Sequence, residues 1–521
     1  MKFVAPALLL AATAALADAS SAWNRSPQAI QQIYKQLRAE KAASGNVNGN
    51  SVKTALARRK PATNNKQFKY LNRSTKQFFV NGTVGSIPDV HFDLPESYAG
   101  LLPISTDKDE TRKLYFWFWP STGGPETQDD IVIWLNGGPG CSSLEGFLQE
   151  NGPFTWKYGT YLPQPNKYTW VNLTNMIWVE QPVGTGFSQG EPNIKNQEDV
   201  AEQFLGFFRN FNNKFNLHNK RVWITGESYA GKYIPYIADA MHNRKDTRNF
   251  NIKGTMMYDP SIHSDLIMEE APAVPFAIRN NAILNLPDET IAALNKTATD
   301  CGLNDFYNTG LTYPPTGPLK APAQKCSRSL WQDIFDAALT VNPCFNIYHI
   351  TDTCPLLWDV LGFPGSTGYL PDGAKVYFAR PEVQRAINAP ATAWEECSER
   401  DVFPHGDASP YPIPGGVMAR IIEKSDRTII AHGLHDFILL ADGSRMAIQD
   451  MNWGGKQGFQ EAPTKKFIVP YDGQGEMGLW HEERKLTYVE IKLSGHMVPQ
   501  YQPGAAYRQL EYLLGRVKDL S

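Results

Sequence analysis

The sequence lacks the features that mark membrane-spanning, nucleic-acid-binding and repetitive proteins. Beyond the N-terminal region, no stretch of its 521 residues reaches about 18 consecutive apolar residues, so we expect no membrane anchor. The formal net charge is only −3, which gives no electrostatic reason to expect nucleic acid as a partner. The chain also has no internal repeat and no low-complexity block. These absences favour a globular protein.

The usual metal-binding patterns are missing as well. None of the ten histidines opens an HxxE or HExxH motif, and none of the six cysteines forms a CxxC pair. Catalytic and structural zinc sites need closely spaced ligands of these kinds. We therefore predict neither a metal nor any other cofactor.

The N-terminus has a pattern typical of a secretory signal peptide. Lys2 precedes an apolar run over residues 3–17 that is too short to span a bilayer, and candidate cleavage sites follow Ala17 and Ala19. We predict a signal peptide over residues 1–19 and a secreted, extracellular protein, with vacuolar delivery as the less favoured destination.

Residues 20–65 are polar and carry basic residues, including the cluster at 58–60. We interpret this segment as a propeptide or flexible leader with a processing site at the cluster, and the alternative is an ordered helix around residues 30–37. The globular domain is then expected over residues 66–521.

Secretion changes the interpretation of the cysteines and asparagines. In an oxidising compartment an even number of cysteines favours disulfides. The sequence has five Asn-x-Ser/Thr sequons, and such sites accept glycans in secreted proteins. The four within the expected domain are Asn72, Asn81, Asn172 and Asn295.

Runs of aromatic and β-branched residues bounded by turn residues predict strands. They lie at 114–119, 131–135, 176–180, 221–225, 427–431, 467–470 and 486–493. Apolar residues recur at helical spacing over 196–211, after Ser228 and over 505–517. Alternating strands and helices predict an α/β fold with a mostly parallel sheet and helices on both faces. Residues from about 240 to 400 have weaker periodicity and contain most of the cysteines, so we interpret them as a capping insertion.

A candidate nucleophile lies between the predicted strand at 221–225 and the helix after it. Ser228 stands in Gly-Glu-Ser-Tyr-Ala-Gly at 226–231, and a serine on a sharp strand-to-helix turn flanked by small residues is a nucleophile elbow. The small residues are needed because the strained turn brings neighbouring backbones close together. The helix N-terminus supplies free N–H groups where an oxyanion forms.

An acid and a histidine must follow the serine in that order. Asp436 comes just after the predicted strand at 427–431, and His496 comes just after the strand that ends at Leu493. Both are expected on loops at strand ends, where catalytic groups gather in α/β sheets. We predict that Ser228, Asp436 and His496 form a catalytic triad.

Other acids and histidines nearby fit the triad less well. Asp442 and Asp450 could replace Asp436, but they follow an apolar stretch with helical character. His432 and His435 flank the acid, and we interpret both as structural histidines with satisfied hydrogen bonds. His481 lies in an acidic hairpin and is expected to face solvent.

Several long motifs resemble one known family. They are Trp-Leu-Asn-Gly-Gly-Pro-Gly-Cys-Ser-Ser at 134–143, Asn-Gly-Pro-Phe at 151–154, Gln-Pro-Val-Gly-Thr-Gly-Phe-Ser at 181–188, Gly-Glu-Ser-Tyr-Ala-Gly-Lys-Tyr at 226–233 and Gly-His-Met-Val-Pro at 495–499. Together they resemble the serine carboxypeptidase family of the α/β-hydrolase fold, from about Tyr98 to the C-terminus. Residues 436–453 are more similar to the fungal carboxypeptidase S1 group than to the vacuolar carboxypeptidase Y group. The resemblance implies an enzyme that removes C-terminal residues from peptides and proteins.

The resemblance also assigns roles to the triad and its surroundings. It implies that Ser228 attacks the scissile carbonyl, that His496 transfers the proton and that Asp436 orients the imidazole. The backbone N–H groups of Gly138 and Tyr229 are expected to form the oxyanion hole, where glycine allows the close approach of the backbone.

Recognition of the substrate's terminal carboxylate is implied for a second set of residues. The resemblance places Asn136, Glu150 and Glu227 around that carboxylate, with Trp134 and Gly137 beside them. Glutamates forced together in a dry site keep a shared proton, which allows them to donate hydrogen bonds. This arrangement predicts peptidase activity that is highest at acidic pH. Met497 is expected either to contact the departing side chain or to fill the core.

One disulfide follows from the resemblance, which implies a bond between Cys141 and Cys397. The other four cysteines leave two arrangements open. The first nests Cys326–Cys344 within Cys301–Cys354, and the second pairs Cys301–Cys326 and Cys344–Cys354 in sequence. We slightly favour the nested arrangement.

Three other classes of function remain as alternatives, and the first of them has two members. A carboxylesterase or an acyltransferase could use the same triad, but neither needs Asn136, Glu150 and Glu227. A metallo-carboxypeptidase would need the zinc ligands that the sequence lacks. A catalytically inactive secreted binding protein is the third.

Overall fold

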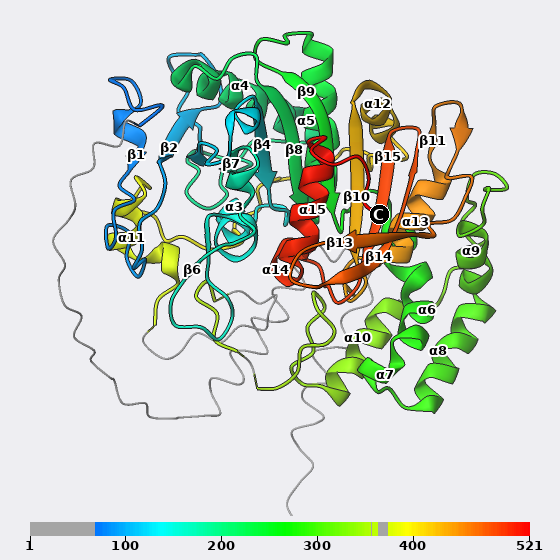
Figure 1. Cartoon of the computed structure of the whole chain (residues 1–521). Helices are drawn as coiled ribbons and strands as arrows, with labels where there is room; N and C mark the ends of the chain where they lie inside the picture. The colour runs from blue at the N-terminus through cyan, green and yellow to red at the C-terminus, as the bar shows by residue number, and fades with distance from the viewer. Residues whose placement is uncertain (1–67, 356, 363–373) are drawn as a thin grey trace, which may run out of the picture.

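The protein is described here by a computed structural model that covers residues 68–355, 357–362 and 374–521 (Figure 1). The predicted signal peptide over 1–19 and the leader over 20–65 lie outside these residues. Within the described ranges, none of the helices combines the length and the apolar character that crossing a bilayer requires.

A single large sheet runs through the molecule and confirms the predicted fold class. Its strand order is β1-β2-β3-β7-β4-β8-β9-β10-β15-β14-β13. The six strands from β7 to β15 run parallel to one another, and the strands at both ends are antiparallel. The bounds are β1 Phe79–Val80, β2 Ser97–Pro103, β3 Lys113–Trp119, β4 Asp130–Leu135, β7 Asn175–Glu180, β8 Arg221–Glu227, β9 Asn251–Tyr258, β10 Arg427–Gly433, β13 Lys465–Val469, β14 Gly475–Glu483 and β15 Leu486–Ile491.

Helices cover both faces of this sheet, as Figure 1 shows. Helices α4, α5 and α12 pack on one face, and α15 packs on the other. The longer helices are α4 Gln197–Phe215, α5 Ala230–Arg244, α6 Ala271–Arg279, α8 Asp288–Asp300, α9 Leu303–Gly310, α10 Leu330–Val341, α12 Val417–Lys424, α13 Ala441–Asp450 and α15 Pro503–Leu513. Shorter helical segments are α3 Ser143–Glu145, η4 Gly146–Asn151, α7 Asn281–Leu284, α11 Pro381–Ala386 and α14 Val498–Tyr501. Two small hairpins pair β5 Phe154–Thr155 with β6 Gln164–Pro165 and β11 Asn452–Trp453 with β12 Lys456–Gln457.

The central strands are apolar along their whole length because both of their faces are buried. In β4, Ile131, Ile133 and Leu135 pack in one core with the residues of α4 and α5. Val132 and Trp134, which point to the opposite face, pack in a second core with the residues of α15. Parallel sheets covered on both sides produce this continuous hydrophobic pattern.

The insertion begins later than the sequence pattern suggested. Strand β9 lies inside the sheet between β8 and β10, so the expected start near residue 240 is wrong. The chain leaves the sheet after Tyr258 and returns to it at Arg427. Helices α6 to α10 of this segment contact one another and form a helical group at one end of the molecule (Figure 1).

The disulfides also differ from the favoured arrangement. Bonds join Cys141 to Cys397, Cys301 to Cys326 and Cys344 to Cys354, so the nested pairing is wrong and the sequential pairing holds. Helix α10 separates Cys326 from Cys344, and its 12 residues span about 18 Å. A disulfide needs Cα atoms within about 7 Å, so a Cys326–Cys344 bond would require both flanking segments to fold back along the helix.

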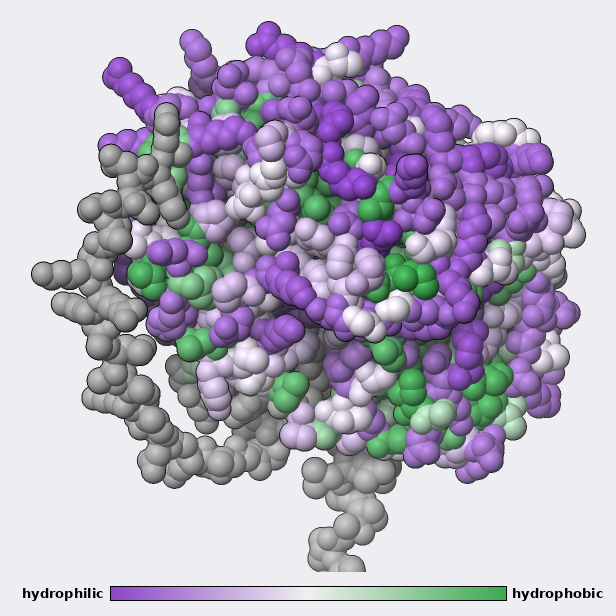
Figure 2. All heavy atoms as spheres, viewed as in Figure 1, coloured by the Kyte–Doolittle hydropathy of each residue, from purple (hydrophilic) through white to green (hydrophobic). Residues whose placement is uncertain are grey.

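One face of the molecule is mainly hydrophilic, as Figure 2 shows. Apolar side chains on this face gather mostly over the lower helices of the insertion. Ile278 of α6, Ile283 of α7 and Val341 of α10 are among the exposed apolar residues. The sheet and its covering helices thus bury their large apolar side chains more completely than the insertion does.

Candidate active site

The predicted catalytic residues meet at one edge of the sheet. Ser228 follows β8, Asp436 lies just beyond β10, and His496 lies just beyond β15. Asn136 follows β4 at the same edge. Because β4, β8, β10 and β15 are parallel, their carboxyl ends lie together, which is where ligands bind in α/β folds.

Ser228 occupies a strained turn between β8 and α5. Its φ angle is 60°, a left-handed conformation that non-glycine residues seldom adopt. A Cβ atom at Gly226 would meet the carbonyl oxygen of Leu135, and one at Gly231 would lie 2.7 Å from the Cβ of Pro260. The turn therefore has the geometry of a nucleophile elbow, and these two glycines are sterically required in it.

The histidine and the acid are in direct contact. Nδ1 of His496 lies 2.7 Å from Oδ2 of Asp436, and the backbone N–H of Ile438 donates to Oδ1 of Asp436 at 2.8 Å. Both side chains are buried. Burial alone would raise the pKa of Asp436, but the charge of the His496 imidazolium and hydrogen bonds from His432 and His496 outweigh it and hold that pKa below its usual value.

The other imidazole nitrogen is available for the serine. Nε2 of His496 is buried and has no hydrogen-bond partner among the described residues. His496 and Ser228 line the same pocket. An imidazole with one nitrogen on a carboxylate and the other facing a serine can act as a general base.

A glycine loop after β4 presses against the elbow. A Cβ atom at Gly137 would lie 2.6 Å from the backbone nitrogen of Tyr229 and 2.7 Å from the Cβ of Ser228. Gly138 has a φ of 110°, and a Cβ atom there would lie 2.7 Å from the backbone nitrogen of Cys141. Only glycine allows this loop to lie so close to the N-terminus of α5.

The pocket beside the serine is built from the sheet edge and from the insertion. Tyr348 of the insertion packs on His496 with ring centroids 5.3 Å apart, and the Cys141–Cys397 disulfide ties the glycine loop to the insertion. The lining residues are Asn136, Gly137, Gly138, Cys141, Glu145, Glu227, Ser228, Tyr348, Glu396, Cys397, His496 and Met497.

Asn136 holds two carboxyl groups at the floor of this pocket. Its Nδ2 donates to Oε1 of Glu227 at 2.8 Å and to Oε2 of Glu145 at 2.5 Å. Trp134 fixes the amide, since its Nε1 donates to Oδ1 of Asn136 at 2.8 Å. Glu150 completes the group, because one oxygen from each of the three glutamates lies within 4.8 Å of the others.

Burial raises the pKa of all three carboxyl groups above the usual value, and repulsion from a neighbouring carboxylate adds to this rise for Glu150 and Glu227. Burial raises the pKa of Glu145 to about 7. Burial and the charges of Glu227 and Glu145 raise the pKa of Glu150 well above its usual value. Burial and the charge of Glu145 do the same for Glu227. Protonated carboxyl groups can donate hydrogen bonds to an anion, and the same oxygen atoms could alternatively contact a cation.

The structure adds Glu145 to the residues expected from the sequence. It lies five residues before Glu150, at the point where α3 ends and η4 begins. An acidic residue in the same short helical segment as a predicted binding residue was a usable signal. Its contact with Asn136 depends on how the segment turns, and the periodicity of so short a helix does not reveal this.

The structure agrees with some of the expectations for the neighbouring histidines and acids and differs from others. His432 is fully buried and has hydrogen-bond partners at both ring nitrogens, whereas Nδ1 of His435 has none among the described residues. His481 was expected to face solvent, but it is buried and its Nε2 lies 2.8 Å from Oε1 of Glu483. Asp442 and Asp450 lie in α13, as their helical surroundings indicated.

The positions of Met497 and of the sequon asparagines are compatible with the roles predicted for them, which stay predictions. Met497 is buried and lines the pocket. The four sequon asparagines within the domain are exposed, as carriers of glycans must be: Asn72, Asn81, Asn172 and Asn295.

Comparisons with known proteins give one consistent family. The profile described as "Serine carboxypeptidase" matches residues 88–516. A "Probable serine carboxypeptidase" of Arthroderma benhamiae is 54% identical over 471 residues, which cover 87% of this chain and 88% of that protein. The "Serine-type carboxypeptidase F" of Aspergillus niger is 46% identical over 479 residues, covering 86% and 88%. Among solved structures, a prohormone-processing carboxypeptidase of Saccharomyces cerevisiae has the same fold, with a TM-score of 0.64, 22% identity and coverage of 85% of this chain and 95% of that one.

Proposed function

Because the chain belongs to the serine carboxypeptidase family, we propose that it cleaves C-terminal peptide bonds under acidic conditions with Ser228, His496 and Asp436. The chain is a hydrolase, and its substrates are peptides with free C-termini. The observation that carries the proposal is the cluster of the three buried carboxyl groups of Glu145, Glu150 and Glu227, two of which (Glu145 and Glu227) line one pocket with Ser228 and His496.

The chemistry follows from the positions of the side chains. Nε2 of His496 takes the proton of Ser228 as the hydroxyl attacks the scissile carbonyl, and Asp436 stabilises the imidazolium. The N–H groups of Gly138 and Tyr229 stabilise the oxyanion. His496 then protonates the departing amino acid, and water hydrolyses the acyl-enzyme by the same route.

The exopeptidase specificity comes from the carboxyl groups around Asn136. A peptide's terminal carboxylate accepts hydrogen bonds from the protonated side chains of Glu150 and Glu227 and from the amide of Asn136, one of whose two N–H groups turns from a glutamate to the substrate. Glu145 holds the amide from the other side. When the pH rises and Glu150 or Glu227 ionises, a donor becomes a second negative charge, and binding of the substrate carboxylate is lost.

Secretion is part of the same proposal. Three disulfides fit an oxidising compartment, and the exposed sequon asparagines fit the same route. N-terminal sequencing of the mature protein together with glycosidase treatment tests this part. A protein that starts at Met1 and does not change in mass would contradict it.

The direct test compares substrates that differ only at the C-terminus. We expect cleavage of an N-blocked dipeptide at acidic pH, with at least about a hundredfold lower kcat/KM for the C-terminal amide, since an unpaired buried donor costs this much. Ser228→Ala should abolish both reactions. Equal rates on the acid and the amide would contradict the proposed carboxylate site. They would favour an esterase or amidase on the same scaffold.

A further inference from the structure

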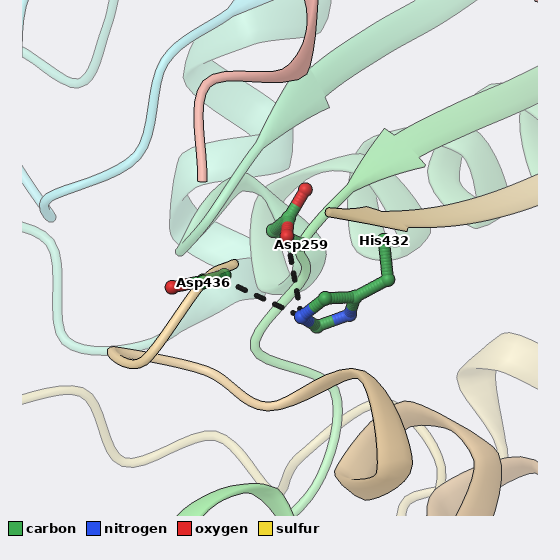
Figure 3. A group of neighbouring side chains, drawn as sticks. All are labelled: Asp259, His432 and Asp436. Carbon is green, nitrogen blue, oxygen red and sulfur yellow. Dashed lines mark ion pairs between the residues drawn. The ribbon is translucent and has the colours of Figure 1, made fainter. Parts of the chain in front are cut away.

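A second buried acid and a histidine lie directly behind the triad, and the mechanism above does not use them. Figure 3 shows His432 of β10 with one ring nitrogen directed at both Asp259 and Asp436. Nε2 of His432 lies 3.2 Å from Oδ1 of Asp259 and 3.6 Å from Oδ2 of Asp436. All three side chains are completely buried. The same Oδ2 contacts Nδ1 of His496, so one oxygen of the triad acid faces two imidazoles.

The surroundings of His432 fix which nitrogen carries a proton. Nε2 lies 2.7 Å from the carbonyl oxygen of Leu439, and a carbonyl can only accept a hydrogen bond. Nε2 is therefore protonated and points its N–H into a group of three acceptor oxygens. Nδ1 lies 3.0 Å from the hydroxyl of Ser444. A protonated Nε2 has no lone pair for a metal ion, so this cluster is organised around protons.

Asp259 is held rigidly in this group. It follows β9 with a φ of 45°, its backbone N–H donates to the carbonyl oxygen of Ala431 at 2.8 Å, and its Oδ1 accepts from the N–H of Gly433 at 2.9 Å. Burial and the negative charge of Asp436 raise the pKa of Asp259 well above its usual value. Of the two neighbouring acids, Asp436 thus keeps the charge and Asp259 stays neutral.

We propose that His432 and neutral Asp259 form a positioning pair that holds the Asp436 carboxylate ionised and aligned with His496. This inference rests on the proposed catalytic role of Asp436. The pair acts through Asp436 and does not touch the substrate. It directs the N–H of His432 toward Oδ2 of Asp436 from 3.6 Å, the same oxygen that contacts His496, in a completely buried site.

Other ionisable groups also face this pair and its target. Glu227, Glu269 and Tyr501 lie close enough to Asp436 for its negative charge to raise the pKa of each of them. Glu490 of β15 faces His432. Glu227 and Glu490 are buried and Glu269 is half-buried, and burial raises the pKa of each of them. The variants below leave these acids in place, so a displaced acidic limb reports on the His496–Asp436 couple.

Loss of the pair has a defined direction. Without the N–H of His432, the Asp436 carboxylate binds a proton more tightly, and it also holds the proton of the His496 imidazolium more tightly. Either route raises the pH at which the couple becomes protonated and inactive. A hydrogen bond to a charged group corresponds to about one pKa unit.

The test measures kcat/KM against pH on an N-blocked amino acid ester. This substrate has no free carboxylate, so the titration of Glu150 and Glu227 does not enter the profile. We expect His432→Ala to move the acidic limb upward by about one pH unit and to lower kcat about tenfold with KM changed less than twofold. His432→Gln, which keeps a donor near the position of Nε2, should restore at least half of the shift. Asp259→Asn, a neutral side chain of the same shape, should leave the limb within about 0.3 units of the wild type.

His481→Ala is the matched control. It also removes a buried histidine bonded to an acid, so it should lower the melting temperature without moving the limb. If His432→Ala lowers the melting temperature but leaves the limb in place, His432 is only structural and the proposal is wrong. If the acidic limb of the pH profile of Asp259→Asn moves as far as that of His432→Ala, then Asp259 is charged in the wild type. This result would also contradict the proposal.

A second pair of variants decides the question if His432→Ala does not fold. Asp259→Ala should move the limb upward and Asp259→Asn should not, so identical limbs for the two contradict the proposal. Wild-type protein that fails to cleave the ester, or a Ser228→Ala variant that cleaves it normally, would instead refute the proposed function. The two failures are therefore distinguishable.

Discussion

At the scale of single residues, burial gives chemically similar acids opposite states. Asp436 is ionised because two imidazoles and two backbone N–H groups face it. Glu150 has no such donors, and its neighbours are the carboxyl groups of Glu145 and Glu227. Both acids are completely buried, so the identity of the neighbours and not the degree of burial decides the charge. An ionised triad aspartate and a group of protonated glutamates that bind the substrate carboxylate can therefore lie close together in one site.

Glu145 is expected to control the pH at which Glu150 and Glu227 ionise. Once Glu145 ionises, its charge adds to burial and to the charge of Glu227 in raising the pKa of Glu150, and it adds to burial in raising the pKa of Glu227. Glu145→Gln keeps the side-chain shape beside Asn136 and removes that charge, so Glu150 and Glu227 should ionise at lower pH. We expect the rise in KM for a free-acid dipeptide to begin about one pH unit lower than in the wild type. A rise that begins at higher pH would mean that Glu145 itself repels the substrate.

At the scale of elements, the site depends on loops that leave parallel strands at one edge. The elbow after β8, the glycine loop after β4 and the loops after β10 and β15 each contribute one part of the machinery. The sheet sets their spacing, and the Cys141–Cys397 disulfide ties one of them to the insertion. Small changes in a loop should therefore alter catalysis more than stability.

Gly137→Ala tests this relation between loop and elbow. The new Cβ would lie 2.6 Å from the backbone nitrogen of Tyr229, so the loop must move away and the oxyanion site must open. We expect kcat to fall about a hundredfold or more while the far-ultraviolet circular dichroism stays unchanged. Gly473→Ala is the control for the added methyl group, because a Cβ there meets nothing within 4 Å; its φ of 72° adds a backbone strain that Gly137 lacks, so this control is a stringent one. Equal activity of the two variants would contradict the assignment.

Much of the element-level structure could be predicted from the sequence. The strands stood out because both faces of the sheet are buried, which makes segments such as 131–135 continuously apolar. The triad followed from the positions of Ser228, Asp436 and His496 at strand ends. Strand β9 did not stand out, because Asn251 and Lys253 interrupt its apolar pattern.

The cysteine pairing and the environment of single side chains could not be predicted in the same way. Pairing of Cys301 with Cys326 depends on how α8, α9 and α10 pack, and local periodicity does not encode this packing. His481 was placed in solvent because Glu482 and Glu483 follow it, yet a β-strand directs alternate side chains to opposite faces. Asp259 and His432 come together only through the pairing of β9 with β10.

At the scale of the whole molecule, the buried acids set the pH at which the protein is most stable. Burial raises the pKa of Glu180 from 4.5 to about 7. An acid with a raised pKa in the folded state contributes stability at low pH, and this contribution is lost as the pH rises toward the folded pKa. For Glu180 alone the difference corresponds to roughly 3 kcal/mol between about pH 4.5 and pH 7.

Thermal unfolding at a series of pH values checks this expectation. We predict a melting temperature that is highest in the acidic range and falls toward neutral pH, since Glu145, Glu150 and Glu227 act in the same direction as Glu180. Glu180→Gln should make the decline shallower. A melting temperature that rises steadily from pH 4.5 to 7 would show that these acids are ionised in the folded protein.

In the proposed mechanism, protonated glutamates hold the terminal carboxylate of the substrate. The most direct test measures, from pH 4 to pH 8, the ratio of kcat/KM for an N-blocked dipeptide to that for an N-blocked amino acid ester. The ester needs only the triad, so the ratio isolates the carboxylate site. We expect a ratio that is highest in the acidic range and falls toward neutral pH as Glu150 and Glu227 ionise. A ratio that is constant or rises with pH would contradict it.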